Sequence, residues 1–448
     1  MQKFIPYIFL LLSVVMPNRI LANDTAYIQP VTGDKLLDTI EVLNNYAIDS
    51  VLANPTPFFA IVPEEDIYFQ WLIQNIDLQL NESDTVVVAD TSIISAIRNC
   101  PDSLFKHRLQ ALPRQIDMTY NHVVRAFILR YLASYPKLTV KLDALSQYYF
   151  PIFEDMLSKY GLPDELKYLA VIESALNPMA HSRMGAAGLW QFMPSTGRLF
   201  NLEINSLIDE RRDPIKSTEA ACRYLVRLYH LFDDWTLALA AYNCGPGNVL
   251  KAMRRSGKKD FWGIYSFLPR ETRSYVPIFV AANYALTYYK DHRISPIYVN
   301  ITFATDTIVT DKRQHFEQIS SLLGVSVAEL RRLNPQYTKD IIPGYKDYAL
   351  CLPANRVLTY IDLQDSILAY RQNELINNRK VEIDLAQRTA VNRGGTYSVN
   401  GVTYYKIRRG DTLSGIAQRF HCSVSQLQKW NGLKGSNISA GKTLKIMR

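Results

Sequence analysis

The stretch YLAVIESALNPMAHSRMGAAGLWQ, residues 168–191, decides the fold, because it sets one carboxylate, Glu173, on the apolar face of an expected helix. Leu166, Leu169, Ala170 and Glu173 follow the three- and four-residue spacing of a single helix face. Burial on such a face raises the pKa of a glutamate toward neutrality and keeps a proton available for donation. On spacing alone, a lone glutamate is more often a core or helix-end residue than a catalytic acid. The surrounding sequence has to decide between the two.

The expected helix has clear limits. Pro163 suits its first turn and the Asn-Pro pair at 177–178 ends it, which puts Glu173 in its last turns. Gly185 and Gly188 in the following loop let the backbone approach a ligand closely. Helical spacing also marks residues 118–132, 148–160, 217–232 and 235–242. The pattern predicts an almost all-α domain.

Further blocks follow this helix in a fixed order. They are GLWQFMPSTG at 188–197, DERRDP at 209–214 and DWTLALAAYNCGPG at 234–247. Together with Glu173-Ser174 they resemble the signature of the soluble lytic transglycosylase domain, and most closely that of its membrane-bound lytic murein transglycosylase D branch. The resemblance covers about residues 116–290 and implies a mainly α, lysozyme-like catalytic domain.

The resemblance also implies site residues. Glu173 matches the catalytic acid, and the matches to substrate-binding residues are Ser174, Gln191, Tyr242, Asn243 and Tyr275. Each has a structural alternative, such as a backbone bond within the helix for Ser174 or local loop bonds for Gln191. Glu271 is a possible helix-start partner of Tyr275. We expect Trp190 and Met193 in the core, and Asp209 and Asp213 as loop and cap residues.

The C-terminus has a different pattern. The expected elements are a strand at 404–408, a helix capped by Asp411 and running to Phe420, a second helix with a Ser423–Gln426 capping box, and a return strand at 443–446. This βααβ order, with RRGDTLSGIA and a terminal WNGL, resembles a small α+β LysM module. LysM modules bind chains that contain N-acetylglucosamine, so the resemblance implies glycan tethering.

A fainter copy of this module lies upstream. Its residues Phe316, Ile319, Leu323, Val327, Leu330, Leu333, Asn334, Ile341 and Gly344 match, without a gap, Leu413, Ile416, Phe420, Val424, Leu427, Trp430, Asn431, Ile438 and Gly441. The copy lacks the Gly-Asp-Thr turn and has Lys312-Arg313-Gln314 nearby. Two roles therefore remain open for the upstream copy. It either binds glycan or is a structural spacer docked on the catalytic domain.

The N-terminus predicts export. Lys3, the apolar run at 4–16 and Ile20-Leu21-Ala22 have the layout of a secretory signal peptide, and the run is too short to span a bilayer. The first cysteine is Cys100, so the sequence does not support a lipid anchor at the expected cleavage point. We expect an exported protein of the periplasm or cell envelope without a transmembrane segment.

Composition limits the remaining classes. The net charge of +8 comes from interspersed charges, which suits an acidic polymer such as peptidoglycan and gives no nucleic-acid patch. Five scattered cysteines and seven scattered histidines give neither a disulfide framework nor metal spacing. We expect no cofactor, no metal and a monomer. The expected organisation is signal peptide 1–22, N-terminal region of unknown role 23–115, catalytic domain 116–295, degenerate LysM-like module 296–353, linker 354–400 and LysM domain 402–447.

The function implied by the resemblance is a peptidoglycan lytic transglycosylase, a carbon–oxygen lyase acting on a polysaccharide. It would cleave the β-1,4 bond between N-acetylmuramic acid and N-acetylglucosamine and leave 1,6-anhydro ends. One acid suffices, because the C6 hydroxyl of the substrate's own muramic acid is the attacking group. A goose-type lysozyme would use water and need a second carboxylate, Asp209 or Asp213. A catalytically silent wall-binding protein is the third alternative.

Overall fold

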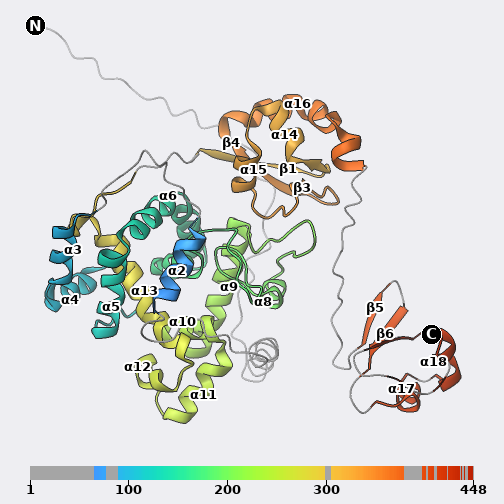
Figure 1. Ribbon diagram of the computed structural model, residues 1–448, viewed down its shortest axis with the longest axis horizontal. Helices are drawn as coiled ribbons and strands as arrows, with labels where there is room; N and C mark the ends of the chain where they lie inside the picture. Colours follow the sequence, from blue (N-terminus) through green and yellow to red (C-terminus); the bar gives the residue numbers. More distant parts are fainter. Residues whose placement is uncertain are drawn as a thin grey trace, which may run out of the picture.

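A computed structural model describes residues 65–76, 89–297, 304–377, 396–399, 402–407, 411–420, 422–433, 435, 438 and 442–446 (Figure 1). The expected signal peptide, residues 23–64 and 77–88 of the expected N-terminal region, and linker residues 378–395 lie outside these ranges. Within the described ranges, none of the helices has the length and apolar character needed to cross a membrane. Three separate hydrophobic cores organise the described residues into a helical domain (65–297), an upstream module (304–369) and a C-terminal module (396–446).

The helical domain is built from helices, which confirms its expected class. Its α-helices are α2 (Glu65–Asn75), α3 (Thr91–Arg98), α4 (Asp102–Ala111), α5 (His122–Leu129), α6 (Pro136–Lys159), α7 (Tyr168–Ser174), α8 (Pro194–Leu199), α9 (Pro214–Phe232), α10 (Trp235–Cys244), α11 (Pro246–Ser256), α12 (Phe261–Ile264) and α13 (Arg270–Tyr288). Helix α9 begins at Pro214, not at Ser217, because Asp213 accepts the N–H groups of its first turn. Short turns join them, among them the π-helical turn η1 (Arg130–Ser134) and the 3-10 turn η2 (Asp164–Lys167).

Helix α13 runs through the middle of this domain. It is buried along most of its length and packs against α5, α6, α7 and α10. A helix buried on all sides is held by its neighbours and gives its side chains fixed positions. Helix α13 therefore presents Tyr275 from a rigid support toward the end of α7, where Glu173 lies.

The helical domain begins earlier than expected. We placed residues before 116 in a separate N-terminal region, but Phe69 and Leu72 of α2 are completely buried in the same core as α13. The Phe69 ring stacks on Tyr135 with centroids 5.2 Å apart. The buried Glu165 carboxylate also accepts the backbone N–H of Ile116 at 3.2 Å. The helices of this region are short and prolines are frequent, so its sequence shows no long apolar period that would predict this packing.

The upstream module holds strands and helices around its own core. Antiparallel pairs join β1 (Thr305–Thr310) to β4 (Tyr348–Pro353) and β2 (Gln314–His315) to β3 (Ile341–Ile342), with helices α14 (Phe316–Leu323), α15 (Val327–Leu333) and α16 (Val357–Ala369). We assigned residues 354–369 to a linker, but Tyr360 and Ile367 of α16 are buried in the module's core. The linker boundary at 354 is therefore wrong, since α16 belongs to the module.

The C-terminal module has the expected strand–helix–helix–strand order. Its elements are β6 (Val402–Lys406), α17 (Leu413–Arg419), α18 (Val424–Asn431) and β7 (Thr443–Ile446), with a further strand β5 (Thr396–Val399) paired to β6. The Ser423–Gln426 capping box is confirmed. The expected Asp411 cap is wrong: Thr412 accepts the N–H of Gly415 at 3.1 Å, and Asp411 instead accepts the Tyr405 hydroxyl at 2.6 Å.

One hydrogen-bonding pattern shows that the two modules are copies. Asn334 donates to the carbonyls of Leu330 and Cys351 and accepts the N–H of Cys351. Asn431, its predicted counterpart, donates to Leu427 and Lys445 and accepts the N–H of Lys445. In both modules the asparagine ties the second helix to the return strand. The repeat inferred from aligned residues is thus reproduced in three bonds per module.

Candidate active site

Glu173 lies at the end of helix α7, as expected. The helix stops at Ser174 because Ala175 and Leu176 adopt left-handed backbone angles, with φ of 55° and 58°. The apolar stripe beneath the acid is confirmed, since Leu169 and Ala170 are completely buried. Glu173 itself is half-buried as a residue.

The surroundings of Glu173 favour its protonated form. Burial raises the pKa of Glu173 from 4.5 to about 7, although a hydrogen bond donated by the Tyr275 hydroxyl to its Oε1 lowers that pKa in part. Near neutral pH the carboxyl is thus divided between its acid and its carboxylate. A group in this condition donates and accepts a proton with equal ease.

Three tyrosines surround the acid. Burial, and the charge of Glu173 in addition, raise the pKa values of Tyr68, Tyr242 and Tyr275 well above 10. All three therefore stay neutral hydroxyls at any physiological pH. Tyr68 comes from α2 and donates to the backbone oxygen of Ile172 at 3.2 Å. We did not foresee it, because nothing in the sequence near Tyr68 signals proximity to residue 173.

Ser174, the last residue of α7, makes the backbone contact that was its structural alternative. It is completely buried, and its hydroxyl lies 3.0 Å from the carbonyl oxygen of Ala170 and 2.9 Å from that of Leu189. The hydroxyl therefore ties α7 to the loop that follows, which is the structural alternative given for Ser174. The contact of Ser174 with substrate stays a prediction.

That loop, residues 185–192, carries Gln191 and is defined here as the substrate loop. Gln191 has a left-handed φ of 46°, and its Nε2 donates to the carbonyls of Ala180 at 3.2 Å and Gly188 at 2.9 Å. Its neighbour Trp190 is completely buried and donates to Thr218 at 2.9 Å, which confirms the expected core position. The loop is therefore closely folded on itself, with Gln191 half-buried at its end.

Replacing Gly188 tests how tightly the substrate loop is packed. A Cβ at Gly188 would lie 1.7 Å from the backbone oxygen of Arg211, whereas a Cβ at Gly185 would meet nothing within 4 Å. Both glycines have positive φ, 85° and 91°, so Gly185→Ala is a matched control for backbone strain. We expect Gly188→Ala to lower the free energy of unfolding by about 1–3 kcal/mol more than Gly185→Ala. Equal unfolding midpoints for the two variants in urea would contradict this packing.

Tyr242 and Asn243 lie at the end of α10. Tyr242 donates to the backbone oxygen of Trp190 at 2.8 Å, which joins α10 to the substrate loop beside the acid. Asn243 is exposed, and its Oδ1 accepts the hydroxyl of the buried Thr272 at 2.9 Å. Thr272 thus orients Asn243 so that its amide nitrogen is left for another acceptor. This positioning role of Thr272 was not visible from the sequence.

The other acids considered in the sequence have structural tasks. Asp213 caps α9 by accepting the N–H groups of Ile215 and Lys216 at 3.0 and 2.9 Å. Asp209 forms a buried ion pair with Arg211 at 2.7 Å. In the described residues no cluster of three or more His, Cys, Asp or Glu side chains is arranged to hold a metal ion. Neither aspartate is among the groups that act on the pKa of Glu173, whereas Glu173 acts on Tyr68, Tyr242 and Tyr275.

Comparison with known families defines the class of protein. Residues 150–265 match the transglycosylase SLT domain, residues 304–369 the LysM-like domain of lytic transglycosylase MltD, and residues 405–446 the LysM domain. An SLT domain followed by two LysM-type domains makes this chain an MltD-like protein.

Individual relatives and one solved structure are similar to parts of this chain, which spans about 61% of the length of the first of them. The chain is 32% identical over 295 residues to membrane-bound lytic murein transglycosylase D of Escherichia coli strain K12, covering 65% of this chain and 61% of that relative. It is 33% identical over 140 residues to the soluble lytic murein transglycosylase of the same strain, covering 28% and 22% of the two chains. An inactive mutant of the lytic transglycosylase Slt from Pseudomonas aeruginosa aligns with a TM-score of 0.30 at 19% identity, over 59% of this chain and 48% of that one.

Proposed function

We propose that this chain is a lytic transglycosylase of peptidoglycan. It cleaves the β-1,4 bond between N-acetylmuramic acid and N-acetylglucosamine and forms 1,6-anhydro ends. The observation that carries the proposal is the raised pKa of Glu173, the acid whose charge acts on Tyr68, Tyr242 and Tyr275. Burial raises the pKa of Glu173 to about 7 although Tyr275 lowers it in part, and no second carboxylate of the described residues is among the causes of that shift. A single carboxyl poised near neutrality fits a reaction in which one group both gives and takes a proton.

The reaction follows from this arrangement in two steps. Protonated Glu173 gives its proton to the glycosidic oxygen, the bond to C1 of the muramic acid breaks, and the leaving sugar departs as an alcohol. The Glu173 carboxylate then takes the proton of the C6 hydroxyl as that oxygen bonds to C1. The Tyr275 hydroxyl stabilises the carboxylate between the steps by donating to it. Glu173 ends protonated, and no water is consumed.

The surrounding residues are proposed to hold the sugar. Asn243, fixed by Thr272, offers its amide nitrogen, and Gln191, whose own amide nitrogen is bonded within its loop, offers its amide oxygen. Tyr242 and Tyr275 keep neutral hydroxyls near the carboxyl because their pKa values are raised well above 10. Tyr68 joins this group from α2. The role of Ser174 is to hold the substrate loop against α7.

The alternatives differ in their products. A goose-type lysozyme would leave reducing ends and would need a water-activating carboxylate, yet Asp209 and Asp213 are engaged by Arg211 and by the first turn of α9. A wall-binding protein would leave no product. Mass spectrometry of purified peptidoglycan after incubation separates the three cases. We expect anhydro ends, and reducing ends or intact glycan would overturn the proposal.

The LysM-type modules are proposed to tether the enzyme to the wall, in the periplasm or cell envelope. Deleting residues 396–448 should weaken co-sedimentation with insoluble peptidoglycan at least about tenfold, while cleavage of short soluble glycans stays within about twofold. The deletion starts at 396 because β5 pairs with β6 and belongs to the module. Unchanged co-sedimentation would remove the tethering role. A matched loss of soluble activity would indicate damage to the catalytic domain.

A further inference from the structure

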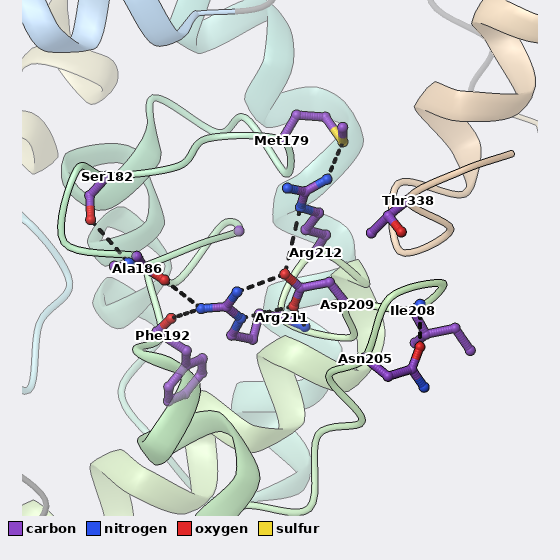
Figure 2. Close-up of polar contacts among 12 residues, drawn as sticks. Met179, Ser182, Ala186, Phe192, Asn205, Ile208, Asp209, Arg211, Arg212 and Thr338 are labelled. Carbon is purple, nitrogen blue, oxygen red and sulfur yellow. Dashed lines mark hydrogen bonds and ion pairs between the residues drawn. The ribbon is translucent and has the colours of Figure 1, made fainter. Parts of the chain in front are cut away.

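The segment between α8 and α9 links the helical domain to the upstream module. Residues 203–213, defined here as the clamp loop, fold back on themselves through an antiparallel bridge between Ile204 and Asp209. The N–H of Asn205 donates to the carbonyl of Ile208 at 2.7 Å, and the Asn205 side chain accepts the N–H of Ile208 at 2.9 Å (Figure 2). The clamp loop is therefore a closed hairpin with a defined tip.

The tip of the clamp loop lies in the core of the upstream module. Leu207 and Ile208 are completely buried there, among residues of the module itself. Ile208 bridges Tyr337, and Thr338 donates through its N–H to Leu207 at 3.0 Å and through its hydroxyl to Ser206 at 2.9 Å. The upstream module thus binds the tip of the clamp loop in two ways, by burying its apolar side chains and by hydrogen bonds to its backbone.

The base of the clamp loop holds the substrate loop. The Arg211 guanidinium, with 5% of its side chain exposed, binds Asp209 in a bidentate pair at 2.8 and 2.7 Å. Its remaining nitrogen donates to the carbonyls of Gly185 at 2.6 Å and Phe192 at 2.9 Å, the first and last residues of the substrate loop (Figure 2). The backbone of Arg211 also touches Gly188 in the middle of that loop.

These contacts form one continuous path. Asp209, which pairs with Arg211, donates its own N–H to the carbonyl of Gln336 in the upstream module at 2.9 Å. A planar guanidinium that satisfies one carboxylate and two carbonyls at once has a single geometry, which a lysine cannot reproduce. The position of the upstream module therefore fixes Asp209, Asp209 fixes Arg211, and Arg211 fixes both ends of the substrate loop.

We propose that Arg211 is a positioning residue for the substrate loop, and that the upstream module keeps it in place through the clamp loop. The upstream module thereby stabilises the conformation of the substrate loop, whether or not the module also binds glycan. The effect on substrate rests on the proposed function, whereas the effect on loop order does not.

Hydrogen exchange of the full chain tests the path without any substrate. We expect Arg211→Lys to speed amide exchange in peptides covering residues 180–193 at least about tenfold. Ile208→Ser, at the far end of the path, should speed exchange in the same peptides. The matched control is Arg331→Lys, since Arg331 makes a bidentate pair with Asp340 at 2.8 and 2.7 Å within the module. That control should leave residues 180–193 unchanged.

The double variant shows whether the two positions act as one unit. If they do, combining Arg211→Lys with Ile208→Ser adds little to the exchange of either single variant. Circular dichroism at the same temperature shows whether each variant is folded. If one of the two single variants is unfolded, the exchange of the other single variant decides whether the proposal holds. Unchanged exchange at 180–193 in a folded Arg211→Lys or Ile208→Ser chain overturns the proposal.

Kinetics with a soluble glycan tetrasaccharide connect the path to function. Arg211→Lys should raise KM about tenfold and lower kcat by less, with the alkaline limb of the pH–rate profile unmoved, because the acid and Tyr275 are untouched. A moved limb or a pure loss of kcat would contradict a positioning role. If the wild-type chain forms no anhydro product, the proposed function fails, and the exchange experiment still decides the role of Arg211 in loop order.

Discussion

Glu173→Gln is expected to abolish glycan cleavage, with a loss of at least about 100-fold, the usual scale of general acid–base catalysis. The amide keeps the size and polarity of the side chain but has no proton to transfer. It also accepts the Tyr275 hydroxyl as the carboxylate does, so the cleft should keep its shape. Formation of anhydro products, followed by chromatography and mass spectrometry, measures the loss. Activity near the wild-type level would eliminate Glu173 as the acid.

Stability provides the control for this variant. The pKa of Glu173 is about 7 in the folded chain against an ordinary 4.5, so the folded state binds more protons than the unfolded state between these values. The contribution of Glu173 to the free energy of unfolding of the wild type is fully present below pH 4.5 and is lost as the pH rises through 7. Glu173→Gln removes that dependence. At pH 8 the variant should therefore unfold at a temperature equal to or above that of the wild type.

The pH dependence of the rate is the second large effect. Because the protonated acid is required first, the rate should fall tenfold per pH unit above about 7, reaching about 100-fold at pH 9. No acidic limb is required of Glu173, because the carboxylate that takes the C6 proton is formed when the acid gives up its own proton in the first step. Anhydro product formed at each pH, with folding checked by circular dichroism, gives the profile. An alkaline limb at or below the value of about 4.3 for a free glutamate would show that burial does not raise the pKa.

Tyr275→Phe provides a directional check on that profile. The Tyr275 hydroxyl lowers the pKa of Glu173, so removing it should raise that pKa and move the alkaline limb to higher pH. Tyr275 is buried in α13, and phenylalanine keeps the ring. A limb that moved to lower pH would mean that another group, and not this hydrogen bond, controls the titration of Glu173.

Local pattern was enough to place the acid and its helix. The apolar spacing around Glu173 and the Asn-Pro stop put it in the last turn of α7, where it lies. The capping box at Ser423 and the asparagines of the two modules were likewise readable, because each depends on residues a few positions apart. Such features follow from helix geometry alone.

Tertiary contacts were not readable in the same way. Tyr68 binds the backbone oxygen of Ile172, next to the acid, from more than a hundred residues away, and the helix that carries it has no clear amphipathic period. Arg211 stood in the DERRDP block, but only its burial between Asp209 and two carbonyls reveals its task. Helix α16 looked like linker because its outer face is exposed at Leu358 and Ile361, while Tyr360 packs inward.

The most direct test of the central claim is cleavage of purified peptidoglycan in water enriched in heavy oxygen. If the substrate's own C6 hydroxyl closes the ring with Glu173 as sole acid and base, the muramic acid ends carry no heavy oxygen and are one water lighter than hydrolysed ends. Digestion of the same material by a hydrolytic lysozyme provides the positive control for label uptake. Heavy oxygen at C1 of the new ends would contradict the single-carboxylate mechanism.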